Sequence, residues 1–259
     1  MTMSEKLHVF VGWDSREDIA YQICRHSLLR RTNVPVVVTP LRQRALRALQ
    51  LYTRAKDPLA STEFTYTRFL VPYLSGYRGW ALFCDCDFLW LEDVTKLFAL
   101  ADPRYAAMCV QHDYRPRETW KMDGCAQSVY PRKNWSSLVL YNCEHPANRA
   151  LTPALANSES GAFLHQFRWL DDSLIGPLPE TWNWLEGWSQ RPADKPPAAV
   201  HFTRGGPWFD AWQDVAYGDL WLAERDHWRA ERAQADAPEA RLGVMWQSPP
   251  TDSTLAVTP

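Results

Sequence analysis

Short apolar runs separated by turns and amphipathic segments predict an α/β fold. The first run, Leu7 to Val11, ends at Gly12, and the apolar positions after it are spaced as in an amphipathic helix that ends near Arg31. The turn at Pro35 leads into a second, β-branched strand, Val36 to Val38. Strand, glycine turn and helix in immediate succession form the start of a βαβ unit, in which ligands bind at the end of the strand.

The next part of the chain predicts two helices and a long strand. Leu41 to Asp57 has a helical composition, and Ser61 or Thr62 can cap a second helix that ends near Tyr73. Residues 80–91 form an almost unbroken apolar run, which is typical of a strand buried on both faces of a sheet. We therefore expect this strand in the protein interior.

The rest of the chain continues the alternation of strands and helices. Strands are predicted at 105–110, 136–141 and 198–202, and helices at 93–98, 146–156 and 210–234. The polar segment 113–134 is too long for an ordinary connection, and we expect a lid or an acceptor-binding loop there. We predict one domain, residues 1–235, with a nucleotide-binding half at 1–112 and a second half at 113–235, followed by a poorly ordered tail at 236–259.

Two carboxylates interrupt the apolar run of residues 80–91. Asp85 and Asp87 are separated by one residue, so in an extended backbone their side chains point to the same side. Unpaired carboxylates at a buried strand end are costly, whereas a divalent cation held between them removes both the repulsion and the desolvation cost. The spacing therefore favours a metal site over the alternative, in which the two acids lie in solvent or pair with arginines.

Three further features are typical of ligand binding. Trp13 and Asp14 follow the first strand and are candidate nucleotide contacts, although Asp14 can also cap the helix. Asp171 and Asp172 form an acidic pair, which can equally be a helix cap. His201 ends a predicted strand just before a glycine turn that lets the backbone approach a ligand. Two carboxylates and one imidazole leave open positions on Mn²⁺ or Mg²⁺ for a diphosphate.

Composition and charge exclude several classes of protein. The net charge is -2 over 259 residues, so no global basic field points to nucleic acid. A local basic cluster is explained best as a solvated helix face; it comprises Arg30, Arg31, Arg42, Arg44 and Arg47. The six cysteines have no regular spacing, which favours reduced, buried thiols in a cytosolic protein. No apolar segment has the length of a signal peptide or a membrane span, so we expect a cytoplasmic protein with at most peripheral membrane contact.

In this combination the sequence resembles the GT-A glycosyltransferases, and most closely glycosyltransferase family 8. Five segments carry the likeness, in the family's order, between Leu7 and Trp212. They are Gly12-Trp13-Asp14-Ser15, Thr67-Arg68-Phe69-Leu70, Leu82-Phe83-Cys84-Asp85-Cys86-Asp87, Asn134-Trp135-Ser136-Ser137-Leu138-Val139-Leu140 and His201-Phe202-Thr203-Arg204-Gly205-Gly206-Pro207-Trp208. The resemblance implies a mixed, mostly parallel Rossmann-like sheet flanked by helices in a single domain.

The resemblance also implies roles for individual residues. The metal would be held by Asp85, Asp87 and His201, and the nucleotide-sugar donor would contact Gly12, Trp13, Asp14, Arg68, Asp85, Arg204, Gly205 and Trp208. Asp171 would hydrogen-bond the transferred sugar, and Asp172 would lie near the anomeric carbon, as a nucleophile or as a stabilising charge. The chain departs from the family at three places. Ser137 stands for a glycine, and Asp171-Asp172-Ser173 stands where the family often has D-Q-D. Gly206 stands for a lysine, so Arg204 would replace that lysine at the donor phosphates.

The activity implied is transfer of a hexose from a UDP-sugar to a glycan or glycolipid, with retention of configuration and with Mn²⁺ or Mg²⁺ as cofactor, in polysaccharide biosynthesis. Two alternatives stay open on the sequence alone. A nucleotidyltransferase would make the sugar nucleotide, but no glycine- and lysine-rich phosphate loop follows the first strand. A non-catalytic sugar-binding protein would use some of the 14 tryptophans for stacking, although core packing is their more frequent use. The acceptor subsite would be lined by Trp120, Tyr130, Trp182, Trp184 and Trp188.

Overall fold

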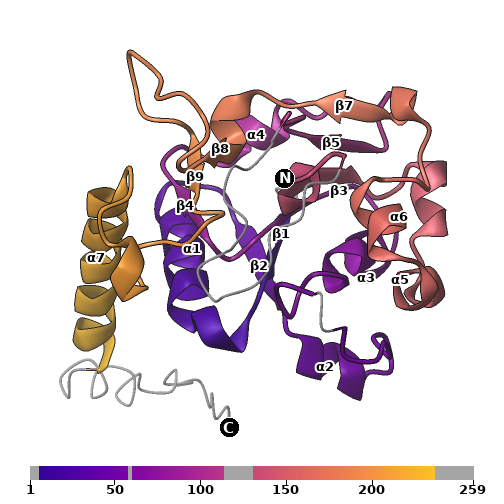
Figure 1. Ribbon diagram of the computed structural model, residues 1–259, viewed down its shortest axis with the longest axis horizontal. Helices are drawn as coiled ribbons and strands as arrows, with labels where there is room; N and C mark the ends of the chain where they lie inside the picture. The colour runs from indigo at the N-terminus through magenta and orange to yellow at the C-terminus, as the bar shows by residue number, and fades with distance from the viewer. Residues whose placement is uncertain (1–5, 58–59, 114–130, 237–259) are drawn as a thin grey trace, which may run out of the picture.

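The computed structural model describes residues 6–57, 60–113 and 131–236, which form a central sheet with helices on both faces (Figure 1). Six strands make up this sheet, in the order β2-β1-β3-β6-β5-β7. Parallel pairing joins β1 to β2 and β3, and β5 to β7, whereas β6 runs antiparallel to both of its neighbours. Five of the six strands therefore point in one direction. Their bounds are β1 Leu7–Gly12, β2 Val36–Leu41, β3 Trp80–Cys84, β5 Ala107–Cys109, β6 Leu138–Asn142 and β7 Ile175–Pro177.

A second, three-stranded sheet lies beside the first, in the order β4-β9-β8. It consists of β4 Phe88–Trp90, β8 Trp184–Leu185 and β9 Ala199–His201. The chain passes from the large sheet to the small one through residues 85–87, directly after β3. Since β9 comes from a distant part of the sequence, this small sheet joins the N-terminal and C-terminal segments of the domain.

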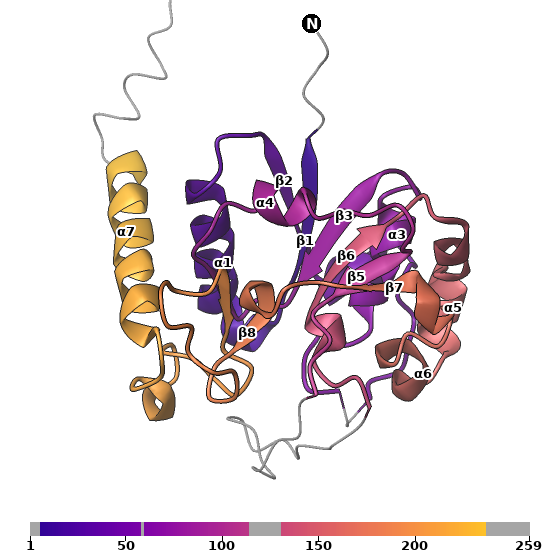
Figure 2. The same cartoon turned by 90° about the horizontal axis from the view of Figure 1, so that it is seen from above.

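Helices lie on both sides of the central sheet. Figure 2 shows α1 and α7 on one side and α3, α5 and α6 on the other. The helices are α1 Asp18–Arg30, α2 Gln43–Ala48, α3 Val71–Leu74, α4 Thr95–Phe98, α5 Pro153–Ser158, α6 Gly161–His165 and α7 Gly218–Asp236. None of the helices within the described ranges is long and apolar enough to cross a membrane.

Buried polar side chains hold the C-terminal helix α7 against α1. Glu224 is 2% exposed, and its two oxygens lie 2.7 Å from His26 Nδ1 and 3.0 Å from Arg31 Nη1. The other ring nitrogen of His26, Nε2, lies 3.0 Å from Glu231 Oε2. Two arginines of the predicted basic cluster, Arg30 and Arg31, therefore pair with the buried carboxylate of Glu224.

The predicted α/β class is confirmed, and several predicted boundaries are wrong. The apolar run of residues 80–91 is two strands of different sheets rather than one continuous strand, because a turn at Cys86–Asp87 redirects the chain. The predicted helix at 41–57 stops at Ala48, where Gln50 takes a left-handed φ of 57°. The segment from Ser61 forms turns before the short helix α3, so no single helix delivers Arg68 to the site.

The interior confirms the prediction of reduced cysteines for the part of the chain that is described. Cysteines 24, 84, 86, 109 and 143 are buried free thiols. Burial raises the pKa of the Cys84 and Cys86 thiols well above the usual value, so both stay protonated beside the acidic turn. The predicted lid at 113–134 lies outside the described residues except at its two ends, as does the predicted tail after residue 236.

Candidate metal centre

The acidic turn between the two sheets places Asp85 and Asp87 at the carboxyl end of β3. The Asp85 amide donates to the Ser137 carbonyl, at 2.9 Å, which ties it to the start of β6. The Asp87 carbonyl accepts from the Phe202 amide, at 3.0 Å, which ties it to the end of β9. Each acid is therefore held by a different sheet, and the turn keeps the two carboxylates close together.

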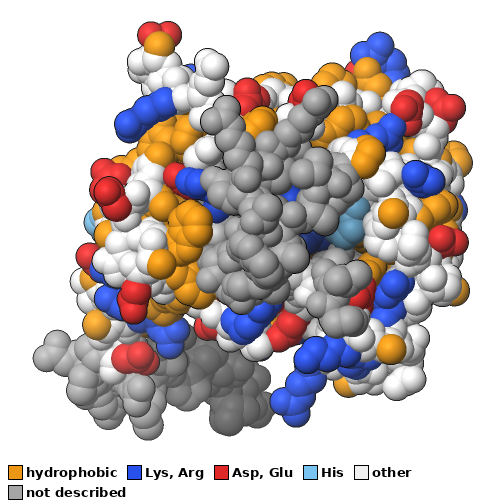
Figure 3. Space-filling model, in the orientation of Figure 1, with side chains coloured by type: hydrophobic (Ala, Val, Ile, Leu, Met, Phe, Trp, Pro, Cys, Tyr) orange, Lys and Arg blue, Asp and Glu red, His pale blue; other side chains and the backbone are white. Residues whose placement is uncertain are grey.

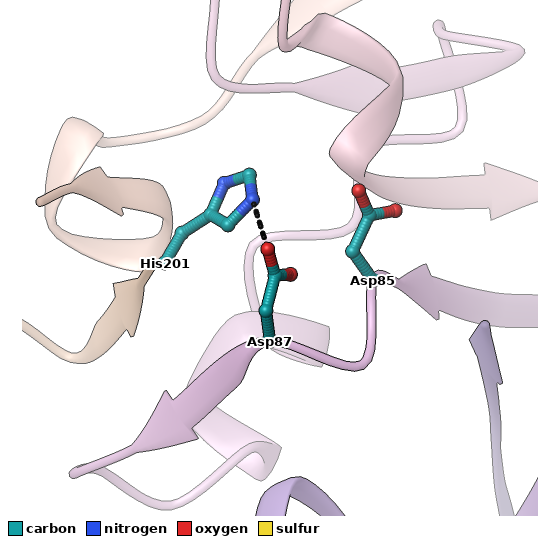
Figure 4. Close-up of side chains that lie close together, drawn as sticks. All are labelled: Asp85, Asp87 and His201. Atoms are coloured by element: carbon teal, nitrogen blue, oxygen red, sulfur yellow. Dashed lines mark ion pairs between the residues drawn. The ribbon is translucent and has the colours of Figure 1, made fainter. Parts of the chain in front are cut away.

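His201 reaches the same turn from β9. It is 1% exposed and lies opposite Phe88 in the antiparallel β4–β9 pair, stacked on the Phe88 ring. Its Nε2 lies 3.3 Å from Asp87 Oδ2, and its Nδ1 lies 2.9 Å from Asn183 Oδ1. Figure 4 shows the imidazole and the two carboxylates facing a common space. Each of the three side chains offers one ligand atom, and these atoms all lie within 4.8 Å of one another.

The pocket around this cluster contains more acidic groups than basic ones. Its volume is about 50 Å³, room for an ion and a few water molecules. Glu17, 4% exposed, joins Asp85 and Asp87 in the lining, against one guanidinium, that of Arg68. A divalent cation would offset this excess of negative charge, and carboxylate oxygens with one imidazole nitrogen are suitable ligands for Mn²⁺ or Mg²⁺. The residues present therefore fit the expected metal.

Arg68 is the cation that the structure brings into the pocket. Its side chain is held between the rings of Phe64 and Phe83, and its Nη1 lies 2.9 Å from Asp85 Oδ1. The same nitrogen donates to the Ser136 carbonyl, at 2.8 Å. At 5% exposure the guanidinium is rigidly placed, and it can offset negative charge at a fixed point.

Arg204, Gly205 and Trp208 follow the end of β9 and are absent from the metal pocket's lining among the described residues. Arg204 Nη2 binds Glu186 Oε2, at 2.9 Å, and its guanidinium packs so closely on Gly187 that a Cβ there would meet it at 2.0 Å. Trp208 packs edge-on against Phe202 in the smaller hydrophobic core. Thr203, rather than Arg204, is the residue of this segment that lines the pocket.

The loop after β1 is held in place by contacts of its own and by hydrogen bonds to Ser61 and Glu63. Asp14 is fully buried and accepts from the Arg16 side chain and from the Glu63 amide. Burial alone would raise the pKa of Asp14, but these hydrogen bonds outweigh it and the pKa is lowered. Asp14 also caps the short helix that starts at Ser15, as one of the two predicted interpretations requires. Trp13 is partly exposed, and its indole N–H donates to Asp18, at 2.7 Å.

A larger groove adjoins the metal pocket and shares Thr62 with it. The groove has a volume of about 590 Å³, within the usual range of ligand pockets. Its lining includes four cationic side chains, those of Arg16, Arg44, Arg47 and Lys56. Figure 3 shows Lys and Arg side chains along the lower edge of this face, in the region of α2. The groove therefore has the charge expected for an anionic ligand.

The acidic pair Asp171 and Asp172 lies at the start of a short 3-10 helix before β7. Asp171 caps it by accepting from the Ser173 amide and hydroxyl, at 2.9 and 2.6 Å. These hydrogen bonds lower the pKa of Asp171 below its usual value. Asp172 pairs with Arg132 Nη2, at 2.5 Å. Arg132 lies two residues before Asn134, and Asn134 lines the metal pocket. Neither acid is part of that pocket's lining among the described residues.

The predicted acceptor residues fall into three groups. Trp120 and Tyr130 lie outside the described residues. Trp182 and Trp184 are 5% and 4% exposed, so both fill the interior rather than a surface groove. Trp188 is 40% exposed, the most exposed of the three predicted acceptor residues that the structure describes.

Sequence reasoning missed four polar residues around the centre. Glu17 and Asn134 line the pocket, and Asn134 keeps a buried amide nitrogen that has no hydrogen-bond partner. Asn183 contacts His201 directly. His112 is 8% exposed, with a buried Nε2 that also has no partner. For Asn183 the available signal was its position between two tryptophans, since a polar residue among apolar ones needs a partner inside the protein.

The sheet order and the acid-acid-histidine centre define the fold class as that of the GT-A glycosyltransferases. The bifunctional glycosyltransferase WbbM superposes with a TM-score of 0.58 at 14% identity, over 96% of this chain and 53% of that chain. The galactosyltransferase LgtC, solved with donor and acceptor sugar analogs, superposes with a TM-score of 0.58 at 11% identity, over 92% of this chain and 99% of that chain. The glycosyltransferase GlyE of Streptococcus pneumoniae TIGR4 superposes with a TM-score of 0.56 at 14% identity, over 88% of this chain and 64% of that chain. This chain thus spans about half the length of the WbbM chain.

At the level of sequence, the chain belongs to the family of Protein CDI of Arabidopsis thaliana. The two are 55% identical over 239 residues, which cover 90% of this chain and 92% of that protein. No family model matches the sequence.

Proposed function

We propose that this protein is a metal-dependent glycosyltransferase that moves a hexose from a UDP-sugar to a glycan or glycolipid acceptor with retention of configuration, as in glycosyltransferase family 8. The observation that carries the proposal is the convergence of Asp85, Asp87 and His201, with ligand atoms within 4.8 Å, at the carboxyl end of β3. In open α/β sheets this end of the strands is where ligands bind.

The donor would occupy the metal pocket and the groove together. The small pocket suits a metal ion and the diphosphate oxygens, and the adjoining groove has the size for a nucleoside and the positive charge for its phosphates. Trp13 and Gly12 stand at the end of β1 beside this groove, so they stay candidate nucleotide contacts. Gly12 also has a packing role, because a Cβ there would lie 2.4 Å from the Phe64 ring.

The chain's own residues would stabilise the leaving diphosphate. When bound, Mn²⁺ or Mg²⁺ would supply positive charge to the phosphate oxygens. Arg68 is preorganised beside Asp85 and adds a second fixed positive charge, which is effective because the guanidinium is buried at 5% exposure. The unpartnered amide nitrogen of Asn134 can donate to a donor oxygen. Asp171 and Asp172 would contact the transferred sugar, with Asp172 oriented by Arg132.

Release of UDP from UDP-glucose and UDP-galactose, measured with and without Mn²⁺, tests the proposal. We expect Mn²⁺-dependent release that Asp87→Asn and His201→Ala abolish. Asp102→Asn is the matched control, because Asp102 is also an acid in a short loop but pairs with Arg104 on the surface. Full activity in excess chelator, or in the Asp87→Asn variant, would refute the metal-dependent mechanism.

The acceptor and the cellular setting belong to the same proposal. A glycan or glycolipid acceptor would approach the transferred sugar beside Asp171 and Asp172, and Trp188, which is 40% exposed, stays a candidate acceptor contact. We propose synthesis in the cytoplasm, with peripheral membrane contact if the acceptor is a lipid. Formation of a UDP-sugar and pyrophosphate from UTP would instead identify a nucleotidyltransferase.

A further inference from the structure

Asn183 is a fully buried amide in the interior behind the metal centre. It lies between Trp182 and Trp184, at the end of a short 3-10 helix that leads into β8. Its Oδ1 lies 2.9 Å from His201 Nδ1, and its Nδ2 lies 2.9 Å from the Ser137 hydroxyl and 3.4 Å from the Asn134 carbonyl. Asn183 therefore connects the histidine to the segment before β6.

The hydrogen-bond network permits one orientation of this amide. The Ser137 hydroxyl donates its proton to the Asn134 carbonyl, at 2.7 Å, so its oxygen is left as an acceptor. Two acceptors, Ser137 Oγ and the Asn134 carbonyl, thus face one end of the Asn183 side chain. That end must be the NH₂ group, since a carbonyl oxygen there would face two other oxygens.

The orientation of Asn183 determines which nitrogen of His201 carries a proton. With its NH₂ group turned toward Ser137, Asn183 presents its oxygen to His201 Nδ1, which must therefore be an N–H donor. In a neutral imidazole the other nitrogen, Nε2, then keeps its lone pair. That lone pair lies on the side of the ring that faces Asp87, at 3.3 Å, where the metal would be bound.

We propose that Asn183 is a positioning residue that fixes the ring orientation and tautomer of His201 for metal binding, and that the hydroxyl of Ser137 orients Asn183. Ser137 thereby acquires a role at a position where the resembling glycosyltransferases have a glycine. This inference rests on the metal site of the proposed function, but it does not depend on which sugar is transferred. A hydrogen-bonded partner on the second nitrogen is a common feature of histidines that bind metals.

Mn²⁺ affinity, measured by electron paramagnetic resonance on the full chain, tests this role. We expect Asn183→Leu, which keeps the side-chain shape and removes the acceptor, to weaken Mn²⁺ binding about 10- to 100-fold. Asn183→Asp keeps an acceptor toward Nδ1 and should lose less affinity than Asn183→Leu, because the Ser137 hydroxyl can rotate to donate to the second carboxylate oxygen. Ser137→Ala should give a smaller loss, because the Asn134 carbonyl still receives the amide.

Asn148→Leu is the matched control for a general effect on folding. Asn148 is also fully buried, and its amide donates to two backbone carbonyls, those of Ala106 and Asn142, without contacting His201. We expect it to lower stability and leave Mn²⁺ affinity unchanged. Nitrogen-15 NMR of the Mg²⁺-loaded wild type should show a proton on His201 Nδ1.

Three results would overturn the inference, and they differ from failure of the proposed function. Wild-type Mn²⁺ affinity in folded Asn183→Leu would refute the positioning role alone, as would an equal loss in the Asp and Leu variants. A proton on Nε2 rather than Nδ1 in the loaded protein would also refute it. If the wild type bound no Mn²⁺ at all, the metal site itself would be wrong and both proposals would fall.

Discussion

Replacement of His112 by glutamine should change how the stability of the protein depends on pH. His112 is 8% exposed, and burial lowers its pKa from the ordinary 6.5 to about 3, with a further lowering by the nearby His201. Its hydrogen bond to the Asn183 backbone offsets only part of this effect. Between pH 6.5 and 3 the imidazole is therefore neutral in the folded chain and protonated in the unfolded chain.

The sign and size of the effect follow from this difference in proton binding. Because the unfolded state binds more protons below pH 6.5, the free energy of unfolding falls as the pH falls through that window. From pH 7 to pH 5 the unfolded histidine gains about three quarters of a proton, which costs the wild type about 2 kcal/mol. His112→Gln lacks this loss, so its stability relative to the wild type should rise by about the same amount.

Urea unfolding at pH 7, 6 and 5, with chelator present, measures the change. His227→Gln is the control, because that ring is exposed on α7 and lies in solvent in the folded and the unfolded chain. We expect the curve of free energy against pH for His112→Gln to diverge from that of the wild type more than the curve for His227→Gln does. A parallel curve for His112→Gln would show that the folded protein accepts the proton at His112, contrary to the reasoning.

Two further predictions concern packing and the C-terminal helix. Gly12→Ala would place a Cβ 2.4 Å from the Phe64 ring, so we expect a loss of about 1–3 kcal/mol in urea unfolding. A second substitution, Phe64→Leu, should recover part of it, and no recovery would contradict the clash. Glu224→Ala removes the buried partner of His26 and Arg31 and should cost about 3 kcal/mol, near the lower limit for breaking a buried ion pair because Arg31 is partly exposed. Amide hydrogen exchange in this variant should become faster in α7 than in β1. An equal change of exchange rate in the two elements would refute this.

The parts of the fold that could be predicted are those in which local pattern and tertiary environment agree. The strand at Leu7–Gly12 and the helix at Asp18–Arg30 have the periodicity that each structure requires, and both were predicted within one or two residues. Asp85, Asp87 and His201 could be predicted as a group because few structures tolerate two acids in an apolar run. Their proximity in space, within 4.8 Å, agrees with that chemistry.

The errors arise where distant contacts decide the local structure. The apolar run of residues 80–91 contains two strands, and each is buried in its own sheet, so hydropathy is the same on both sides of the turn at Cys86–Asp87. The end of α2 at Ala48 depends on a left-handed residue, Gln50, which helical composition does not forbid. Arg204 stays a predicted donor contact, and its ion pair with Glu186, 18 residues earlier, could not be inferred from either position alone.

In the segment Trp182–Trp184, attention to the two tryptophans hid the importance of Asn183 between them. Its tryptophans suggested a sugar-stacking surface, yet Trp182 packs in the main hydrophobic core and Trp184 in the smaller core beside it. Anchoring in two cores fixes the backbone on both sides of Asn183, so this amide can hold His201 without being mobile itself. Two large buried indoles that flank one buried amide therefore indicate a polar residue held in a fixed position. Because its backbone is anchored in this way, Asn183 can orient His201, a ligand of the metal centre.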